Sequence, residues 1–186
     1  MFDKTLLGRL AMKIPLSALK DKHVIEMFPA FGLLSTRLLK KEPLSYTFVE
    51  VDKNVVKSLE RLAQAGQDNN IGVRLLRTEP LQDDFGRFLY QSELRIAEPD
   101  PKTVDTEELS DTVCVANAPF WCTQIFLKRL CQDVSEGAGL FKAGRVPIYM
   151  SSQMEVGHRI VTKNSELAKL VDNYFTVAPL CIIEGK

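Results

Sequence analysis

The segment 23–35, His-Val-Ile-Glu-Met-Phe-Pro-Ala-Phe-Gly-Leu-Leu-Ser, constrains the fold of this chain more than any other. An apolar run contains the acidic Glu26 near its end, a short loop follows, and the residues after Gly32 have the periodicity of a helix. A strand that turns through such a loop into a helix is typical of nucleotide-binding α/β sheets, where glycines let the backbone turn tightly. In this chain Phe28 and Ala30 stand at two positions where glycine is expected.

Short apolar runs alternate with helical patterns along the chain. Because runs that are apolar on both faces alternate with helices, we predict an α/β, Rossmann-like fold whose mostly parallel central sheet has helices on both faces. The predicted strands are residues 23–28, 46–51, 73–76, 112–116 and 146–151, with a further strand at 174–183. The predicted helices are residues 33–40, 54–65, 121–134 and 153–162. Residues 98–111, which are acidic and contain two prolines, are predicted to form an exposed loop.

Composition narrows the classes of function. The chain has 186 residues, enough for one domain with a buried core, and its 24 Lys and Arg balance its 24 Asp and Glu. A zero net charge argues against a large phosphate-binding surface and leaves a local basic groove open. The four cysteines lack metal-ligand spacing and are predicted to be reduced and buried, and no metal site is expected. No apolar run approaches the roughly 20 residues of a membrane helix, so no membrane partner is expected.

Two acidic residues belong to strand ends at the predicted ligand edge of the sheet. Glu26 lies at the end of the first strand, and Glu50 lies at the end of the second, about 20 residues beyond the loop, where an acid commonly binds ribose hydroxyls. Each acid alone is equally typical of a solvated strand end. Together they favour a nucleoside-shaped pocket beyond the carboxyl ends of the strands.

The run 113–121, Val-Cys-Val-Ala-Asn-Ala-Pro-Phe-Trp, ends another predicted strand at the same edge. Asn117 and the carbonyl of Pro119 offer acceptors to an exocyclic amine, and the ring of Phe120 offers a surface on which a base can stack. These are the groups that methylation of an amino nitrogen on an extruded base requires. The alternative is a strand that simply ends at a proline and is covered by aromatic packing, and the motif alone favours neither.

Taken in order, these motifs resemble the rRNA adenine N6-dimethyltransferase family, which includes the mitochondrial transcription factors B. The similarity lies in Val-Ile-Glu-Met-Phe-Pro-Ala-Phe-Gly, Phe-Val-Glu-Val-Asp, Arg-Thr-Glu-Pro, Val-Ala-Asn-Ala-Pro-Phe and the later Gln-Met-Glu-Val-Gly-His-Arg, and it covers about residues 22–180. The resemblance implies one S-adenosylmethionine-dependent methyltransferase domain over residues 1–186. Residues 1–21 would be a helical lead-in, and the family's C-terminal helical domain would be absent or truncated.

The resemblance also implies roles for individual residues. The residues that it places around S-adenosylmethionine are Glu26, Phe28, Ala30, Gly32, Glu50, Glu79 and Asn117. Within this set, Glu50 would contact the ribose and Glu79 would face the adenine of the cofactor. The target adenine would be held by Asn117, Pro119 and Phe120.

The departures from the family decide the expected function. The ring of Phe28 would occupy space near the methionine part of the cofactor, and Ala30 at a positive φ would cost about 1–2 kcal/mol. These changes resemble the fungal-type mitochondrial transcription factor branch, in which methyl transfer has been lost. We therefore expect a mitochondrial matrix protein that helps the single-subunit mitochondrial RNA polymerase recognise and melt promoter DNA. The alternative is an active enzyme that dimethylates adenine N6 in rRNA.

Under the first hypothesis a cleft lined by Asn117, Phe120 and Trp121 would accept unstacked bases, and a minority of the basic residues would neutralise phosphates. The candidates for phosphate contacts are Arg37, Lys40, Lys41, Lys128, Arg129, Lys142 and Arg145.

Overall fold

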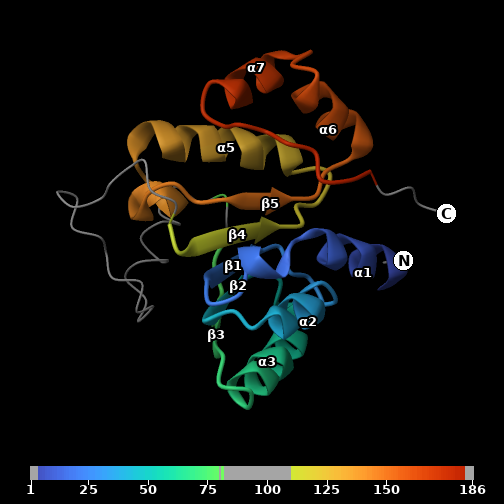
Figure 1. Ribbon diagram of the computed structural model, residues 1–186, viewed down its shortest axis with the longest axis vertical. Coiled ribbons are helices and arrows are strands. Elements are labelled where there is room, and N and C mark those ends of the chain that lie inside the picture. The colour runs from blue at the N-terminus through green and yellow to red at the C-terminus, as the bar shows by residue number, and fades with distance from the viewer. Residues whose placement is uncertain (1–3, 80, 82–109, 183–186) are drawn as a thin grey trace.

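The computed structural model describes residues 4–79, 81 and 110–182 (Figure 1). The described strands form one parallel sheet in the order β3-β2-β1-β4-β5, which confirms the predicted fold class. The strands are β1 (His23–Met27), β2 (Ser45–Val49), β3 (Gly72–Leu76), β4 (Thr112–Ala116) and β5 (Ile148–Met150). The α-helices are α1 (Lys4–Lys13), α2 (Ser35–Leu38), α3 (Lys53–Gln67), α5 (Thr123–Glu136), α6 (Met154–Val161) and α7 (Glu166–Asp172). Short 3-10 helices span Leu16–Ala18, Leu39–Lys41 and Gly139–Ala143.

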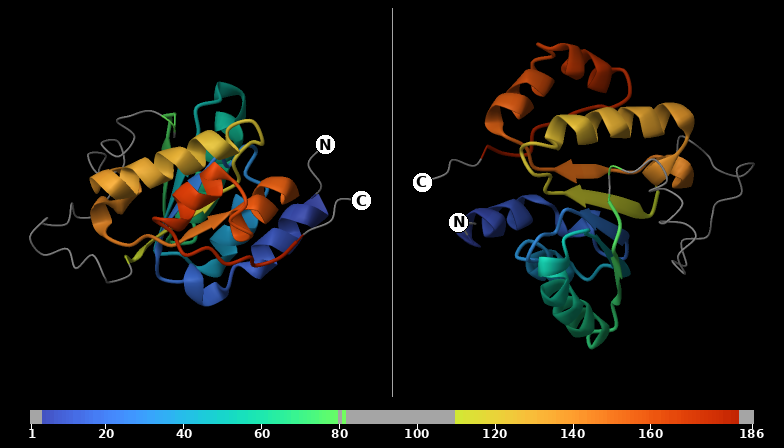
Figure 2. Two further views of the ribbon diagram at one scale, coloured as in Figure 1. Left: turned by 90° about the horizontal axis from the view of Figure 1, so that it is seen from above. Right: turned by 180° about the vertical axis from the view of Figure 1, so that it is seen from behind.

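Helices cover both faces of the sheet, as predicted (Figures 1 and 2). Helices α1, α2 and α3 lie on one face, α5 lies on the other, and α6 and α7 form an outer layer beyond α5. All five residues of the interior strand β4 are buried because both of its faces are covered.

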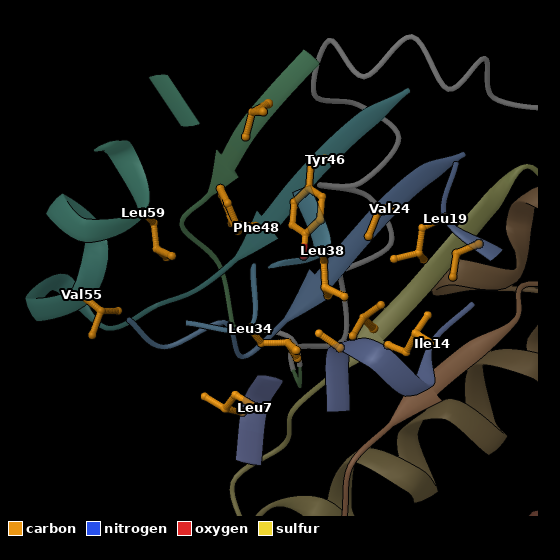
Figure 3. Close-up of a cluster of buried hydrophobic side chains, with 14 residues drawn as sticks. Leu7, Ile14, Leu19, Val24, Leu34, Leu38, Tyr46, Phe48, Val55 and Leu59 are labelled. Carbon is orange, nitrogen blue, oxygen red and sulfur yellow. The ribbon is translucent and has the colours of Figure 1, made fainter. Parts of the chain in front are cut away.

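Alternate residues of the strands pack into two separate hydrophobic cores. In β1, Val24 joins the first core cluster with Tyr46, Phe48 and α3 residues such as Leu59, as Figure 3 shows. Ile25 points the other way, into the second core cluster, which α5 covers. Successive side chains of a strand point to opposite faces, and here both faces are covered by a core. This explains why the sequence is almost continuously apolar in β1 and β4.

The order of the strands places the topological switch point of the sheet beside β1. The chain runs from β1 outward to β3, then returns to β4 on the opposite side of β1, so the order reverses between β1 and β4. Open α/β sheets bind ligands at such a reversal, beyond the carboxyl ends of the strands. In the register, Met27 lies opposite both Val49 and Ala116, which brings the segments after β1, β2 and β4 to one edge.

The structure corrects the expectation for the C-terminal part of the chain. No strand occurs within residues 174–182 of the predicted strand 174–183, and residue 183 lies outside the described residues. The amides of Tyr174 and Phe175 donate to the carbonyl of Val171 at the end of α7, and Pro179 has no amide to donate.

Helix α7 was missed by the sequence analysis although its signal is local. The Ser165 side chain accepts a hydrogen bond from the Ala168 amide at 3.0 Å, as an N-cap does, and Ala168 and Val171 are buried one turn apart. The predicted strand 146–151 is also shorter than expected, since β5 covers only Ile148–Met150. Most of the predicted loop 98–111 lies outside the described residues.

Candidate functional site

The loop after β1 keeps a conformation that glycine favours. Phe28, Ala30 and Gly32 have φ of 59°, 50° and 74°, so every second residue is left-handed. For the two residues with a Cβ, this conformation costs about 1–2 kcal/mol each. The backbone path expected of a glycine-rich loop is therefore present, although Gly32 is its only glycine.

The Phe28 side chain is accommodated by packing. Its ring meets the ring of Phe126 in α5 edge to face, with centroids 5.4 Å apart and an interplanar angle of 88°. Phe28 is half-buried against the second core cluster. This aromatic contact offsets part of the backbone cost of the left-handed residue.

Gly32 is required by packing as well as by its positive φ. A Cβ at this position would overlap Leu62 Cδ1 and lie 3.2 Å from Leu59 Cδ2, both of which belong to α3. The close approach of the loop to α3 therefore explains this glycine without any ligand.

Glu50 joins the end of β2 to the loop. Its Oε2 accepts a hydrogen bond from the Ala30 amide at 3.2 Å, while its Oε1 accepts from the amides of Val51 and Asp52 at 2.9 Å each. The carboxylate is half-buried. The loop after β1 and the acid at the end of β2, which were both predicted to bind the cofactor, are thus in direct contact.

Glu26 lies beneath the loop and is fully buried. Burial raises its pKa to about 7, and the nearby hydroxyl groups of Ser35 and Tyr46 limit the rise. Tyr46 donates a hydrogen bond to Glu26 Oε2 at 2.7 Å. By geometry, Glu26 Oε1 and Ser35 Oγ have no hydrogen-bond partner among the described residues. Ser35 therefore acts on the carboxyl group as a nearby dipole and does not form a hydrogen bond with it.

Asn117 is anchored at the carboxyl end of β4. Its amide donates to the carbonyl of Met27 at 3.2 Å, and its Oδ1 accepts a hydrogen bond from Ser151 Oγ at 2.6 Å. Ser151 follows β5 and was missed by the sequence analysis. The signal was available, because Ser151 ends the predicted strand 146–151 and the ends of parallel strands share an edge.

The carbonyl of Pro119 accepts hydrogen bonds at the start of α5. It accepts hydrogen bonds from the amides of Cys122 and Thr123 at 3.0 and 3.1 Å and from the Thr123 hydroxyl at 3.1 Å. Phe120 and Trp121, which follow it, expose 66% and 75% of their surface. Exposed aromatic rings beside a strand-end amide form a surface on which unpaired bases can stack.

Glu79 reaches the same edge from the end of β3. Burial raises the pKa of the Cys122 thiol, and the negative charge of Glu79 raises it further. The Glu79 carboxylate therefore lies near the start of α5. The amide of Leu81 donates to Glu79 Oε1 at 3.4 Å. The predicted site residues after β1, β2, β3 and β4 therefore all lie beyond the carboxyl ends of the strands, except Glu26, which belongs to the interior.

Two of the residues predicted to contact phosphate make hydrogen bonds within the protein. Lys41 Nζ donates to the carbonyl of Ile14 at 2.8 Å. Arg129 Nε donates to the buried carboxylate of Asp133 at 2.7 Å, and only 11% of the Arg129 side chain is exposed. This buried ion pair argues against Arg129 as one of the minority of basic residues that contact phosphate. Arg37, Lys40 and Lys128 are exposed.

The described residues contain no group of three or more His, Cys, Asp or Glu side chains that could hold a metal ion. No helix in the same part of the chain is long and apolar enough to cross a bilayer. Cys114, Cys122 and Cys131 are free and buried, whereas Cys181 is free and only half-buried.

Comparisons with known proteins agree on a family. The family model described as "Ribosomal RNA adenine dimethylase" matches residues 1–184. The mitochondrial dimethyladenosine transferase 1 of Caenorhabditis elegans is 25% identical over 139 residues, which are 74% of this chain and 36% of that protein.

Two solved structures show the same fold. The 23S rRNA methyltransferase ErmE superposes with a TM-score of 0.56 at 18% identity, over 90% of this chain and 55% of its own. The 16S rRNA N2 G1207 methyltransferase of Thermus thermophilus, solved with S-adenosylmethionine and guanosine, superposes with a TM-score of 0.51 at 16% identity, over 97% of this chain and 40% of its own. The chain thus spans 36%, 55% and 40% of the length of these three proteins, in the order in which they are given.

Proposed function

Because this chain belongs to the ribosomal RNA adenine dimethylase family, we propose that it is the part of an rRNA adenine N6-dimethyltransferase that binds S-adenosylmethionine and the target adenine. The distant similarity to a mitochondrial dimethyladenosine transferase supports a mitochondrial matrix location. Its partner in this function is single-stranded rRNA.

The observation that supports this proposal most strongly is the backbone of the loop after β1. Left-handed residues at positions 28, 30 and 32 and the hydrogen bond from the Ala30 amide to Glu50 maintain the backbone of a nucleotide-binding turn, although two of its usual glycines are replaced. The Phe28 ring packs against Phe126 and the second core cluster. This packing supports the proposal that the loop leaves room for the cofactor.

In this proposal the cofactor is held by the loop residues 28–32 together with Glu50, Glu79 and Asn117. S-adenosylmethionine supplies an electrophilic methyl group when bound. The second lone pair of Asn117 Oδ1 accepts an N6 hydrogen of adenine, and Phe120 stacks on the base. The chain therefore acts by orienting the amine, which is the main requirement when little acid–base chemistry is needed.

The Pro119 carbonyl was expected to share in holding the amine. In the structure this oxygen already accepts hydrogen bonds from the amides and side chains of Cys122 and Thr123 at the start of α5. We therefore assign Pro119 to fixing the direction of the turn, so that Asn117 carries the polar contact to the base.

A second candidate function is favoured by the side chains of Phe28 and Ala30. Both residues are strained in this loop. Such residues would accumulate if selection for cofactor binding had been lost. In this function the same exposed aromatics bind the melted strand of promoter DNA, and the partner is the mitochondrial RNA polymerase.

Calorimetric titration of the purified chain with S-adenosylmethionine separates the two functions. The proposed enzyme binds with a micromolar Kd and transfers radiolabelled methyl groups to single-stranded rRNA fragments. Glu50→Gln weakens this binding because it removes the charged acceptor, and Ala30→Gly strengthens it by relaxing the loop. The matched control is Glu155→Gln, which changes an exposed acid on α6. Absence of binding, together with stimulated transcription by the polymerase on a promoter template, establishes the second function instead.

A further inference from the structure

We infer that Ser151 is a positioning residue that holds the amide plane of Asn117 and thereby sets the preference of the site for an adenine amino group. The inference deepens the proposed function and rests on it. It concerns a residue that follows β5, a strand to which the sequence analysis assigned no part in the site.

The hydrogen bond between the two side chains is short and is built on rigid backbone. Ser151 Oγ lies 2.6 Å from Asn117 Oδ1. The Asn117 amide donates to the carbonyl of Met27, and the Ser151 amide donates to the carbonyl of Ala116 at 3.0 Å. Both backbones thus continue the ladders of the sheet past the strand ends, and only side-chain torsions remain free.

The bond determines how the Asn117 amide meets a base. An asparagine recognises adenine by accepting from the N6 amine and donating to a ring nitrogen at the same time, which requires the amide and the base to share a plane. The Ser151 hydroxyl occupies one lone pair of Oδ1 and leaves the second one for the amine. Without this restraint the amide rotates about its last torsion, and paired contacts with the base form less often.

The hydrogen bond between Asn117 and Ser151 lies where the proposed function places the target base. Asn117 and Ser151 are both half-buried, so their hydrogen bond is partly shielded from competing water. The exposed ring of Phe120 follows Asn117 by three residues at the same edge. A bond of this kind is worth about 1 kcal/mol, which corresponds to roughly a fivefold change in an equilibrium.

The test uses the full chain and a fluorescence signal that the sequence supplies. Trp121 is the only tryptophan, and it is exposed four residues after Asn117, so a stacking base quenches it. The probes are two short oligouridine RNAs, one with a single central adenosine and one with purine riboside, which lacks the amine. We expect the wild type to bind the adenosine probe about fivefold more tightly, and Ser151→Ala to bind both probes equally.

Three comparisons make the result specific. Ser151→Thr keeps the hydroxyl and restores the preference, whereas Ser152→Ala, a change at the exposed neighbouring serine, leaves it intact. In methyl transfer, Ser151→Ala lowers kcat for the adenosine probe by about fivefold, and its affinity for an all-uridine RNA stays unchanged. Thermal melts establish that each variant is folded, so a purely structural effect is recognised by a lowered Tm and weaker binding of all three RNAs.

Two outcomes overturn the inference in distinguishable ways. If the wild type prefers adenosine and Ser151→Ala retains the full preference, Ser151 has no positioning role and the proposed function stands. If the wild type does not distinguish the probes and transfers no methyl group, the proposed function fails and the inference falls with it.

Discussion

The buried carboxyl group of Glu26 links the stability of the protein to pH. Burial raises its pKa from 4.5 to about 7, so between these values the folded protein binds a proton that the unfolded chain has released. Stability therefore falls as the pH rises from 4.5 to 7, and it levels off above 7, where the carboxyl group is ionised in both states. The total change from this group is on the order of 3 kcal/mol.

We expect Glu26→Gln to remove this dependence. Glutamine stays neutral, and its side-chain oxygen still accepts the hydrogen bond of Tyr46. The free energy of unfolding of the variant relative to the wild type should rise by roughly 2–3 kcal/mol between pH 5 and pH 8. Urea denaturation at several pH values measures this difference, and Glu155→Gln serves as the exposed control. A constant difference across this range would mean that Glu26 is ionised in the folded protein even at pH 5.

At the scale of elements, the turn that ends α5 depends on two glycines for different reasons. Gly137 is left-handed with φ 58°, and a Cβ there would meet no atom within 4 Å. Gly139 is left-handed with φ 55°, and a Cβ there would overlap the Asp133 carboxylate, which is buried and bonded to Arg129. Steric overlap with a buried ion pair adds to the cost of strain only at Gly139.

Alanine substitutions at these two glycines should therefore differ. We expect Gly137→Ala to lower the free energy of unfolding by about 1 kcal/mol, the cost of a left-handed alanine. Gly139→Ala should cost about 3 kcal/mol or more, because breaking a buried ion pair leaves an uncompensated charge. Guanidinium denaturation measures both. Equal losses in the two variants would show that Asp133 moves aside at little cost.

At the scale of the whole molecule, the outer layer is held more weakly than the sheet. The third cluster, formed by Leu127, Cys131 and Val171 with partly buried neighbours, joins α6 and α7 to α5. Helix α6 has no buried residue, whereas β4 is buried throughout. Stability within a domain follows such differences in apolar burial.

Amide hydrogen exchange should reveal this division. Under native conditions the amides of α6 and α7 should exchange through local opening, at least tenfold faster than those of β1 and β4, which exchange only on global unfolding. Mass spectrometry of peptides from each element measures the rates. The variant Val171→Ala should accelerate exchange in α6 and α7 alone. Uniform exchange across all these elements would instead indicate that the outer layer unfolds together with the sheet.

Much of the fold could be predicted from the chain. The predicted strands 23–28 and 112–116 agree with β1 and β4 to within one residue, because a buried strand bounded by polar residues is a local pattern. The predicted strand 174–183 failed because a strand needs a partner edge, which local sequence does not supply. The loop after β1 was located correctly, but the left-handed conformation of Phe28 could only be read from the structure.

The sequence by itself determined the order of the strands and α-helices from β1 to α6, the edge at which their functional ends meet and the family. Apolar periodicity and turn residues carry this information because they act between neighbours in the chain. Only the tertiary structure decided that Glu50 bonds the Ala30 amide and that Ser151 holds Asn117, since these pairs are 20 and 34 residues apart. Such contacts depend on strand register and on the packing of side chains across the sheet, which no local pattern encodes.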